Sequence, residues 1–93
     1  RPVIIASGGI KTPLDAIKAL ILGSDCVGMA GEVLHHLVQT DLPSTTQWLQ
    51  DWLAQFKQLM LLVGAQRIAD LQRVPVVFDS TLVSYAEQRG IQL

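Results

Sequence analysis

The sequence predicts an α/β protein built from one βαβ unit followed by helices. Two short apolar runs, residues 3–6 and 26–30, each end in a turn of small residues that leads into a helical pattern. Continuous apolar runs of this kind are typical of parallel strands that are buried on both faces. Because a helix connects the two runs, we expect a right-handed crossover, with both turns at the same edge of the sheet.

The helix between the two runs carries start and stop signals. Thr12 is a good N-cap, and Pro13 occupies the first helical position, where its missing N–H costs nothing. Asp15 completes a capping box with Thr12. Gly23 is expected to end the helix in the left-handed conformation, just before the second apolar run.

A short helix over residues 31–38 and then a long one are predicted after the second run. Ser44 and Gln47 resemble a capping box that opens the long helix, and Gly64 ends it. Apolar residues recur in it every three or four positions, which predicts a helix packed on the sheet. These positions are Trp48, Leu49, Trp52, Leu53, Phe56, Leu59, Met60 and Val63.

The last third of the chain is predicted to hold two shorter helices and an extended segment. Residues 66–73 show a helical pattern, and residues 75–78 form a short extended run after a proline. Ser80 and Thr81 are candidate caps for a final helix that ends near Gly90.

Composition excludes several classes of partner. The 93 residues are 49% hydrophobic and carry seven basic and eight acidic side chains, for a formal net charge of -1. No basic patch is available for nucleic acid or an anionic membrane surface, and no apolar run approaches the roughly 18 residues of a membrane span. The single cysteine, Cys26, is expected to be a buried thiol in a reducing compartment. We therefore expect a cytoplasmic protein.

No catalytic or metal-binding motif is visible. His35 and His36 are adjacent, so their side chains point about 100° apart on a helix and cannot readily share one metal ion. The chain contains no recognisable triad, P-loop or zinc pattern. We therefore assign no catalytic residue and no metal ligand to this segment.

The two small-residue turns carry the chemistry that the sequence predicts. Glycines after a parallel strand leave backbone N–H groups open to a ligand, and the start of the following short helix adds N–H donors and a partial positive charge. A lysine near the first turn adds a cation at the rim. The candidate phosphate-binding residues are Ser7, Gly8, Gly9, Lys11, Ala30 and Gly31.

This pair of turns matches the phosphate site of (β/α)8 TIM barrels, which is formed by the loops after strands seven and eight and a short extra helix. A complete barrel needs about 250 residues. The predicted fold is therefore an incomplete barrel: the C-terminal part of a TIM barrel, a single fragment over residues 1–93 with a βαβ unit and C-terminal helices.

Three stretches carry a resemblance to a known family. They are IIASGGIKTPLDAIKALILGSDCVGMAGEVL, WLQDWLAQFKQLMLLVGAQRIADLQRVPVV and YAEQRGI. Together they resemble the C-terminal portion of type 2 isopentenyl-diphosphate delta-isomerase, over nearly the whole chain. The first stretch is also similar to other flavin and nucleotide barrels, which usually place Asp where this chain has Ser7.

The resemblance implies a homo-oligomeric TIM-barrel enzyme that interconverts isopentenyl and dimethylallyl diphosphate with reduced FMN, Mg²⁺ and NADPH. Residues 7–9, 30 and 31 then hold the FMN phosphate. Lys11 stands where the family commonly has Arg, so its contact changes from a bidentate one to a point charge. The family's catalytic and Mg²⁺-binding residues match no position here, so we expect the isolated fragment to be inactive and to self-associate through residues 3–6 and 26–30.

Two alternatives remain open at this point. The segment is also compatible with another FMN-dependent TIM-barrel oxidoreductase, although Ser7 and the later helix argue against it. A non-catalytic helical interaction module, in which the apolar stripe of the long helix binds a partner chain, is the second alternative.

Overall fold

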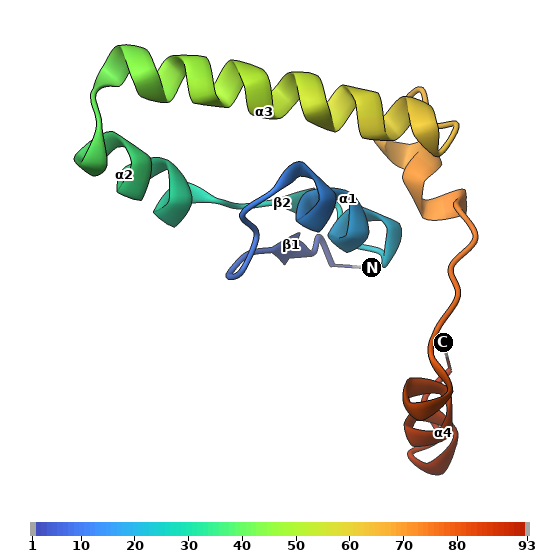
Figure 1. Ribbon diagram of the computed structural model, residues 1–93. Coiled ribbons are helices and arrows are strands. Elements are labelled where there is room, and N and C mark those ends of the chain that lie inside the picture. The colour runs from blue at the N-terminus through green and yellow to red at the C-terminus, as the bar shows by residue number, and fades with distance from the viewer. Residues whose placement is uncertain (1, 93) are drawn as a thin grey trace.

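The computed structural model describes residues 2–92, which form a short parallel sheet, four α-helices and one 3₁₀ helix (Figure 1). In chain order the elements are β1 (Ile5–Ala6), α1 (Pro13–Ile21), β2 (Cys26–Val27), α2 (Ala30–Gln39), α3 (Leu42–Leu62), η1 (Ile68–Arg73) and α4 (Ser80–Gln88).

The predicted βαβ unit is confirmed, with shorter strands than the apolar runs suggested. β1 and β2 pair in parallel, with Ile5 opposite Cys26 and Ala6 opposite Val27. Before the ladder, the Asp25 carboxylate accepts the Ile4 N–H at 2.8 Å; after it, the Gly28 N–H donates to the Ala6 carbonyl at 2.8 Å. Both strands then run toward α2 (Figure 1), so the turns that follow them lie at the same edge.

The helix between the strands begins as its sequence predicts. The Asp15 N–H donates to Thr12 Oγ1 at 3.2 Å, and the Asp15 carboxylate accepts the Thr12 N–H at 3.1 Å, which closes the capping box. Gly23 follows the helix with φ of +118°, the left-handed conformation expected of it. These interactions join residues within one or two turns, so the local sequence is enough to specify them.

The long helix starts earlier than predicted and has a different cap. α3 begins at Leu42, and the Asp41 side chain accepts the Ser44 N–H at 2.8 Å, so Asp41 is the N-cap and Ser44 lies inside the first turn. Gln47 does not reach back to the cap, because its side-chain amide donates forward to Asp51 at 2.9 Å. The end near Gly64 is confirmed: α3 stops at Leu62 and Gly64 has φ of +78°.

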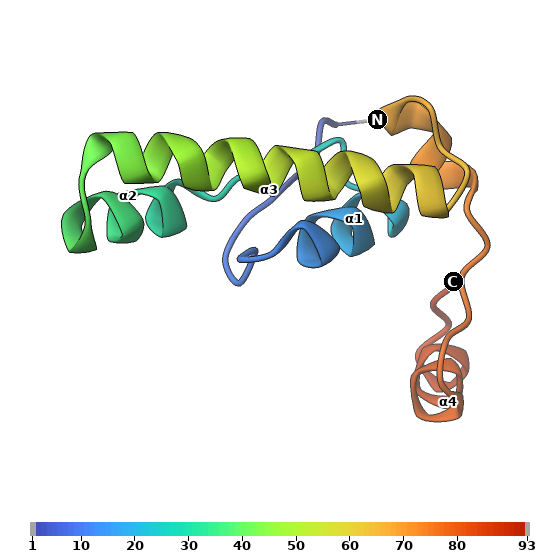
Figure 2. The ribbon, with the colours of Figure 1, turned by 45° about the horizontal axis from the view of Figure 1, so that its top comes forward.

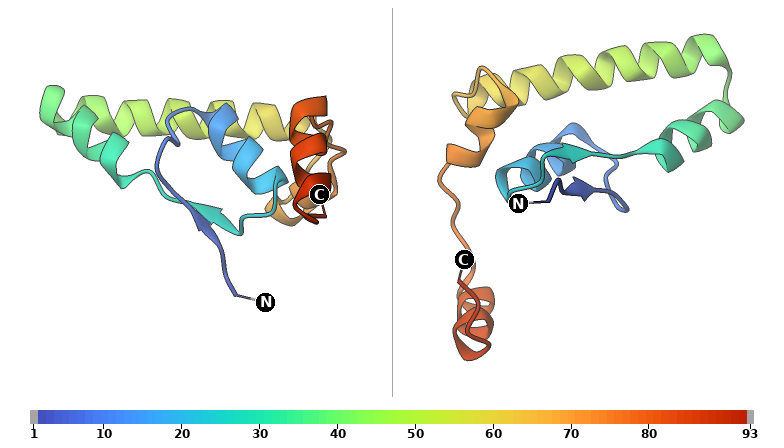
Figure 3. Two further views of the ribbon diagram at one scale, coloured as in Figure 1. Left: turned by 90° about the horizontal axis from the view of Figure 1, so that it is seen from below. Right: turned by 180° about the vertical axis from the view of Figure 1, so that it is seen from behind.

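The apolar stripe of α3 packs on helices, not on the sheet as predicted. Figure 2 shows α1 and α2 following one another along α3. In the left panel of Figure 3, α1 lies between α3 and the two strands. Part of the stripe is buried, including Trp52 and Met60, whereas Leu53 is 53% exposed. The helix-on-helix contact arises because α1 already covers the face of the two short strands that α3 was expected to cover.

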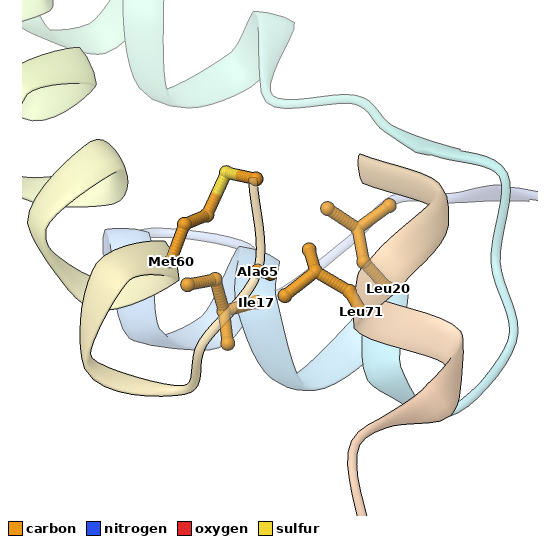
Figure 4. Packing of buried hydrophobic residues seen from close by; sticks show 5 residues of the cluster. All are labelled: Ile17, Leu20, Met60, Ala65 and Leu71. Atoms are coloured by element: carbon orange, nitrogen blue, oxygen red, sulfur yellow. The ribbon is translucent and has the colours of Figure 1, made fainter. Parts of the chain in front are cut away.

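The core lies where α1, the end of α3 and η1 meet (Figure 4). Ile17 and Leu20 of α1 pack against Met60, Ala65 and the fully buried Leu71. Leu71 belongs to the helical pattern predicted over residues 66–73, which forms a 3₁₀ helix, η1. Truncating a buried Leu such as Leu71 to Ala typically costs about 2–5 kcal/mol of folding free energy.

The last helix extends away from the rest of the molecule. Residues 75–78 are extended, as predicted, and lead to α4, which lies apart from the other elements (Figure 1 and the right panel of Figure 3). Its cap is Asp79, whose side chain accepts the Leu82 N–H at 2.8 Å, and not Ser80 or Thr81. The radius of gyration is 15.7 Å, against about 12 Å for a compact domain of this length, so the shape is elongated.

The strands are not buried on both faces as predicted. Val3 is 74% exposed, Ile5 is 63% exposed, and Cys26 is an exposed thiol, not a core residue. The reason is that α1 covers one face only of the sheet in the described part of the chain. The α/β class is thus confirmed, while the assignment of the chain as part of an incomplete TIM barrel stays a prediction.

Candidate phosphate-binding site

The turns after β1 and β2 line one cavity of about 300 Å³. This volume is at the lower end of the range for small-molecule sites, which is roughly 300–1,000 Å³. Residues from both turns contribute to the wall. They are Ser7, Gly8, Gly9, Ile10, Gly28, Met29, Ala30, Gly31 and Glu32.

The first turn takes a backbone conformation that favours glycine. Gly8 and Gly9 have φ of +78° and +76°, where an L side chain is strained. Apart from the glycine and its two neighbours in the chain, no atom of the described residues lies within 4 Å of a Cβ placed on either glycine. The turn therefore presents main chain to an open space, and a ligand can approach it closely.

The second turn presents the start of α2. Its N-cap, Met29, offers only a weakly accepting thioether, and no side-chain cap is made to this end of α2 within residues 2–92. By contrast, α1, α3 and α4 are capped by Thr12, Asp41 and Asp79. The first N–H groups of α2, with the positive end of the helix dipole, are therefore free of side-chain acceptors beside the cavity.

One acidic side chain opposes an anion at this site. Glu32 lies in the first turn of α2 and also lines the cavity. A carboxylate in this position interacts favourably with the helix dipole, but it repels a bound phosphate. The backbone donors supply the attraction, and Glu32 reduces it.

Lys11 lies outside the cavity wall. Its N–H donates to the Asp15 carboxylate at 3.2 Å, and its carbonyl accepts the Trp52 indole N–H at 3.2 Å. With Thr12, Trp48 and Trp52 it lines a neighbouring hollow of about 190 Å³. The Lys11 backbone is thus fixed at the end of the first turn, and Lys11 lines a hollow beside α3 in place of the cavity wall.

Five of the nine residues in the cavity wall are candidates that the sequence predicted. Ser7, Gly8, Gly9, Ala30 and Gly31 line the same cavity, as expected, and Lys11 does not. The residues that the sequence did not predict are Ile10, Gly28, Met29 and Glu32. Their position next to the predicted residues could have identified them: Ile10, Met29 and Glu32 each adjoin a predicted residue, and Gly28 directly follows the second strand.

Three larger hollows occur elsewhere in the described part of the chain: one of about 550 Å³ is lined by polar side chains of α4 alone, from Ser80 to Gln88, and the other two are apolar. One of about 630 Å³ lies between the end of α3 and Ile68, and another of about 600 Å³ lies between the end of α1 and residues 75–78. Their walls are mainly apolar side chains, such as Phe56 in the first and Phe78 in the second. The cavity at the two turns is a better candidate for an anionic group than the apolar hollows, and unlike the hollow on α4 it lies at a helix start without a side-chain cap.

Comparison with known proteins gives this cavity a context. Residues 1–77 match the family described as FMN-dependent dehydrogenase. The chain belongs to the FMN-dependent dehydrogenase family. Both turns fall inside the matched range, so the family's phosphorylated flavin is the natural ligand to test against the cavity.

Curated relatives in this family carry a more specific name. The chain is 43% identical over 88 residues to an isopentenyl-diphosphate delta-isomerase of Lacticaseibacillus paracasei, and this match covers 95% of the chain and 26% of the relative. Proteins of the same name from Latilactobacillus sakei (40% identity, 97% of the chain, 26% of the relative) and Listeria monocytogenes serotype 4a (39%, 96%, 25%) are also similar. The resemblance to isopentenyl-diphosphate delta-isomerase is thus confirmed.

The match spans about a quarter of the length of these relatives. Within residues 2–92, no three His, Cys, Asp or Glu side chains are grouped in a way that would hold a metal ion. No helix in the described part of the chain is both long and apolar enough to cross a membrane.

Proposed function

We propose that this chain is a segment of an isopentenyl-diphosphate delta-isomerase and that the cavity between its two turns binds the phosphate of FMN. The single observation that carries the proposal is the cavity itself: two turns separated by a helix, both in the family's matched range, present glycine backbone and an uncapped helix start to one space. On this proposal, residues 1–93 form one unit of a TIM-barrel domain.

The residues present fit a phosphate group. The open space in front of Gly8 and Gly9 admits an oxygen close to the main chain, and the first N–H groups of α2 supply further donors. Ser7 adds a hydroxyl at the same wall. These groups bind and orient the phosphate end of the cofactor, and Lys11 contributes a longer-range positive charge from outside the wall.

The rest of the proposed activity depends on groups other than these. When bound, the reduced flavin supplies proton transfer without net redox change in the interconversion of isopentenyl and dimethylallyl diphosphate. Mg²⁺, NADPH and the isoprenoid diphosphate are assigned to other parts of the enzyme, since the cavity offers one anion site and residues 2–92 contain no cluster of side chains that would hold a metal ion. We therefore expect the 93-residue chain by itself to show no isomerase turnover.

A chimera tests the proposal directly. Residues 1–93 replace the matching segment of the Lacticaseibacillus paracasei protein, and the purified chimera is assayed for bound flavin and for isomerisation. We expect both, and we expect a Gly8→Val chimera that folds to lose both. A folded chimera without flavin would show that the cavity is not the binding site for the FMN phosphate.

The same assay addresses the second candidate function, an FMN-dependent oxidoreductase, which the name of the matched family favours. A chimera that binds FMN but does not isomerise isopentenyl diphosphate favours this alternative. A chimera that does both shows that the segment can serve in an isomerase, which is the outcome expected from the first proposal.

Self-association and a cytoplasmic location are part of the proposal. Val3 and Ile5 leave an exposed apolar strand, and such edges pair readily with another chain. Light scattering at high protein concentration is expected to give a mass above the 10.2 kDa of one chain. Ile5→Lys is expected to lower the measured mass to that of the monomer. A monomeric wild-type chain would contradict the prediction.

A further inference from the structure

The first glycine turn is connected to α3 by one long-range hydrogen bond. Trp52 Nε1 donates to the Lys11 carbonyl at 3.2 Å, across 41 residues of sequence. Trp52 is 8% exposed and Lys11 is exposed, so the donor is shielded from water and the bond as a whole is partly buried. A partly shielded hydrogen bond is stronger than a fully exposed one, and a buried indole N–H that loses its acceptor costs stability.

This bond acts at one end of the turn. At the other end, the Gly28 N–H donates to the Ala6 carbonyl and holds the last residue of β1. At the Lys11 end, the Asp15 carboxylate accepts the Lys11 N–H, and the indole holds the carbonyl of the same residue. Between these ends lie Gly8 and Gly9, which have the widest conformational freedom of any residue type. The direction of their N–H groups therefore depends on how firmly both ends are held.

Trp52 is itself held in place. Its ring stacks on Phe56 with a centroid separation of 5.8 Å and an interplanar angle of 8°. Further along α3, Met60 belongs to the core with Ile17 of α1. The indole N–H thus projects from a fixed helix and can define the position of the Lys11 carbonyl.

We infer that Trp52 is a positioning residue for the proposed phosphate site: its indole N–H fixes Lys11 and so orients the N–H groups of Gly8 and Gly9 toward the phosphate. The inference rests on the proposed function for the identity of the ligand, but the effect on the turn is independent of the ligand. It also gives Lys11 a role through its backbone, in addition to its charge.

Trp52→Phe in the 93-residue chain removes the donor and retains an aromatic ring. If the smaller phenyl ring leaves a packing defect, 3-benzothienylalanine at position 52 is the closer isostere, because sulfur takes the place of the indole N–H. Trp48→Phe is the matched control: the same change one turn earlier on α3, where the indole stacks on His36 at 4.9 Å.

The first readout needs no ligand. We expect ¹⁵N relaxation to show faster or wider motion of the Gly8, Gly9 and Ile10 amides in both Trp52 variants, with the amide and methyl signals of Ile17 and Leu71 unchanged. Trp48→Phe is expected to leave the turn as it is in the wild type. A purely structural role predicts a general loss of order, and equal turn dynamics in wild type and Trp52 variants would overturn the inference.

The second readout compares FMN with riboflavin, which lacks the phosphate, by following the same amides in titrations. Loss of one hydrogen bond is expected to weaken FMN binding about two- to tenfold and to leave riboflavin unaffected. If the wild type binds FMN and Trp52→Phe binds it equally well, the inference is wrong. If the wild type responds equally to FMN and riboflavin, the proposed function is wrong, and the relaxation data alone decide whether Trp52 positions the turn.

Discussion

The turn after β1 and the turn after β2 line the same cavity, but their glycines meet different requirements. Gly8 and Gly9 have positive φ, so the backbone itself calls for glycine there. Gly31 lies in the first turn of α2 without positive φ, and no described atom lies within 4 Å of a Cβ placed on it. The fold would accept a side chain at Gly31, and only a ligand in the cavity would exclude it.

The largest effect is expected at Gly8, with Gly64 as its control. Both residues have φ of +78° and open space around a Cβ, but Gly64 follows α3, away from the cavity. Alanine at either position should lower the free energy of unfolding by about 1–2 kcal/mol. Only Gly8→Ala should also reduce FMN binding, by tenfold or more, measured as flavin retained by the chimera. Equal flavin retention by the two variants would show that the first turn does not bind the FMN phosphate.

At Gly31, stability and binding are expected to change in opposite directions. Gly31→Ala raises helix propensity and should stabilise the chain by up to about 1 kcal/mol. Its methyl group adds bulk at the cavity wall, so FMN binding should fall several-fold, with Gly31→Val worse than Gly31→Ala. Thermal unfolding and flavin titration on the same samples check both signs. A rise in FMN affinity with increasing side-chain size would contradict the proposed space for the ligand.

A smaller effect is expected from the charge at Glu32. Glu32→Gln removes a carboxylate from the cavity wall and should strengthen FMN binding about two- to fivefold at low salt, with the gain shrinking as salt increases. Riboflavin binding should not change. Glu87→Gln on α4 is the control, since it makes the same charge change outside the cavity. Unchanged FMN affinity in Glu32→Gln would place the phosphate elsewhere.

The smallest effect is expected from acid at the capped end of α1. The N–H groups of Thr12 and then Lys11 donate to the Asp15 carboxylate and hold its pKa below the ordinary value of about 4. A lowered folded-state pKa contributes stability that is fully present above the unfolded-state pKa and is lost as pH falls through the folded-state pKa. Stability should therefore fall below about pH 4, and Asp15→Asn should flatten part of this fall.

Carboxyl ¹³C titration of the wild type measures the Asp15 pKa itself. Asp41 and Asp70 contribute in the same direction, because hydrogen bonds from Ser44 and from the Arg67 backbone, respectively, lower the pKa of each. Asp15→Asn should thus remove only its own share. An Asp15 pKa at or above the ordinary value would show that the capping box is not formed in solution.

Much of the site was predictable because it depends on short-range interactions. Residues 7–9, 30 and 31 follow strand signals directly, and parallel pairing brings the ends of both strands to one edge. The cap of α1 was equally local. The cap of α3 was missed because Asp41 and Ser44 are both good capping residues. In the structure Asp41 is the N-cap, which places Pro43 in the first turn, where proline is tolerated.

By itself, then, the sequence determined the βαβ unit, the positive-φ turn at Gly8 and Gly9 and the helix between the strands, because backbone preferences and capping bonds act within a few residues. Only the tertiary structure decided that α3 packs on α1, that Cys26 is exposed, and that Trp52 reaches Lys11. These contacts join residues far apart in the chain, and their geometry depends on which faces remain uncovered after the helices pack.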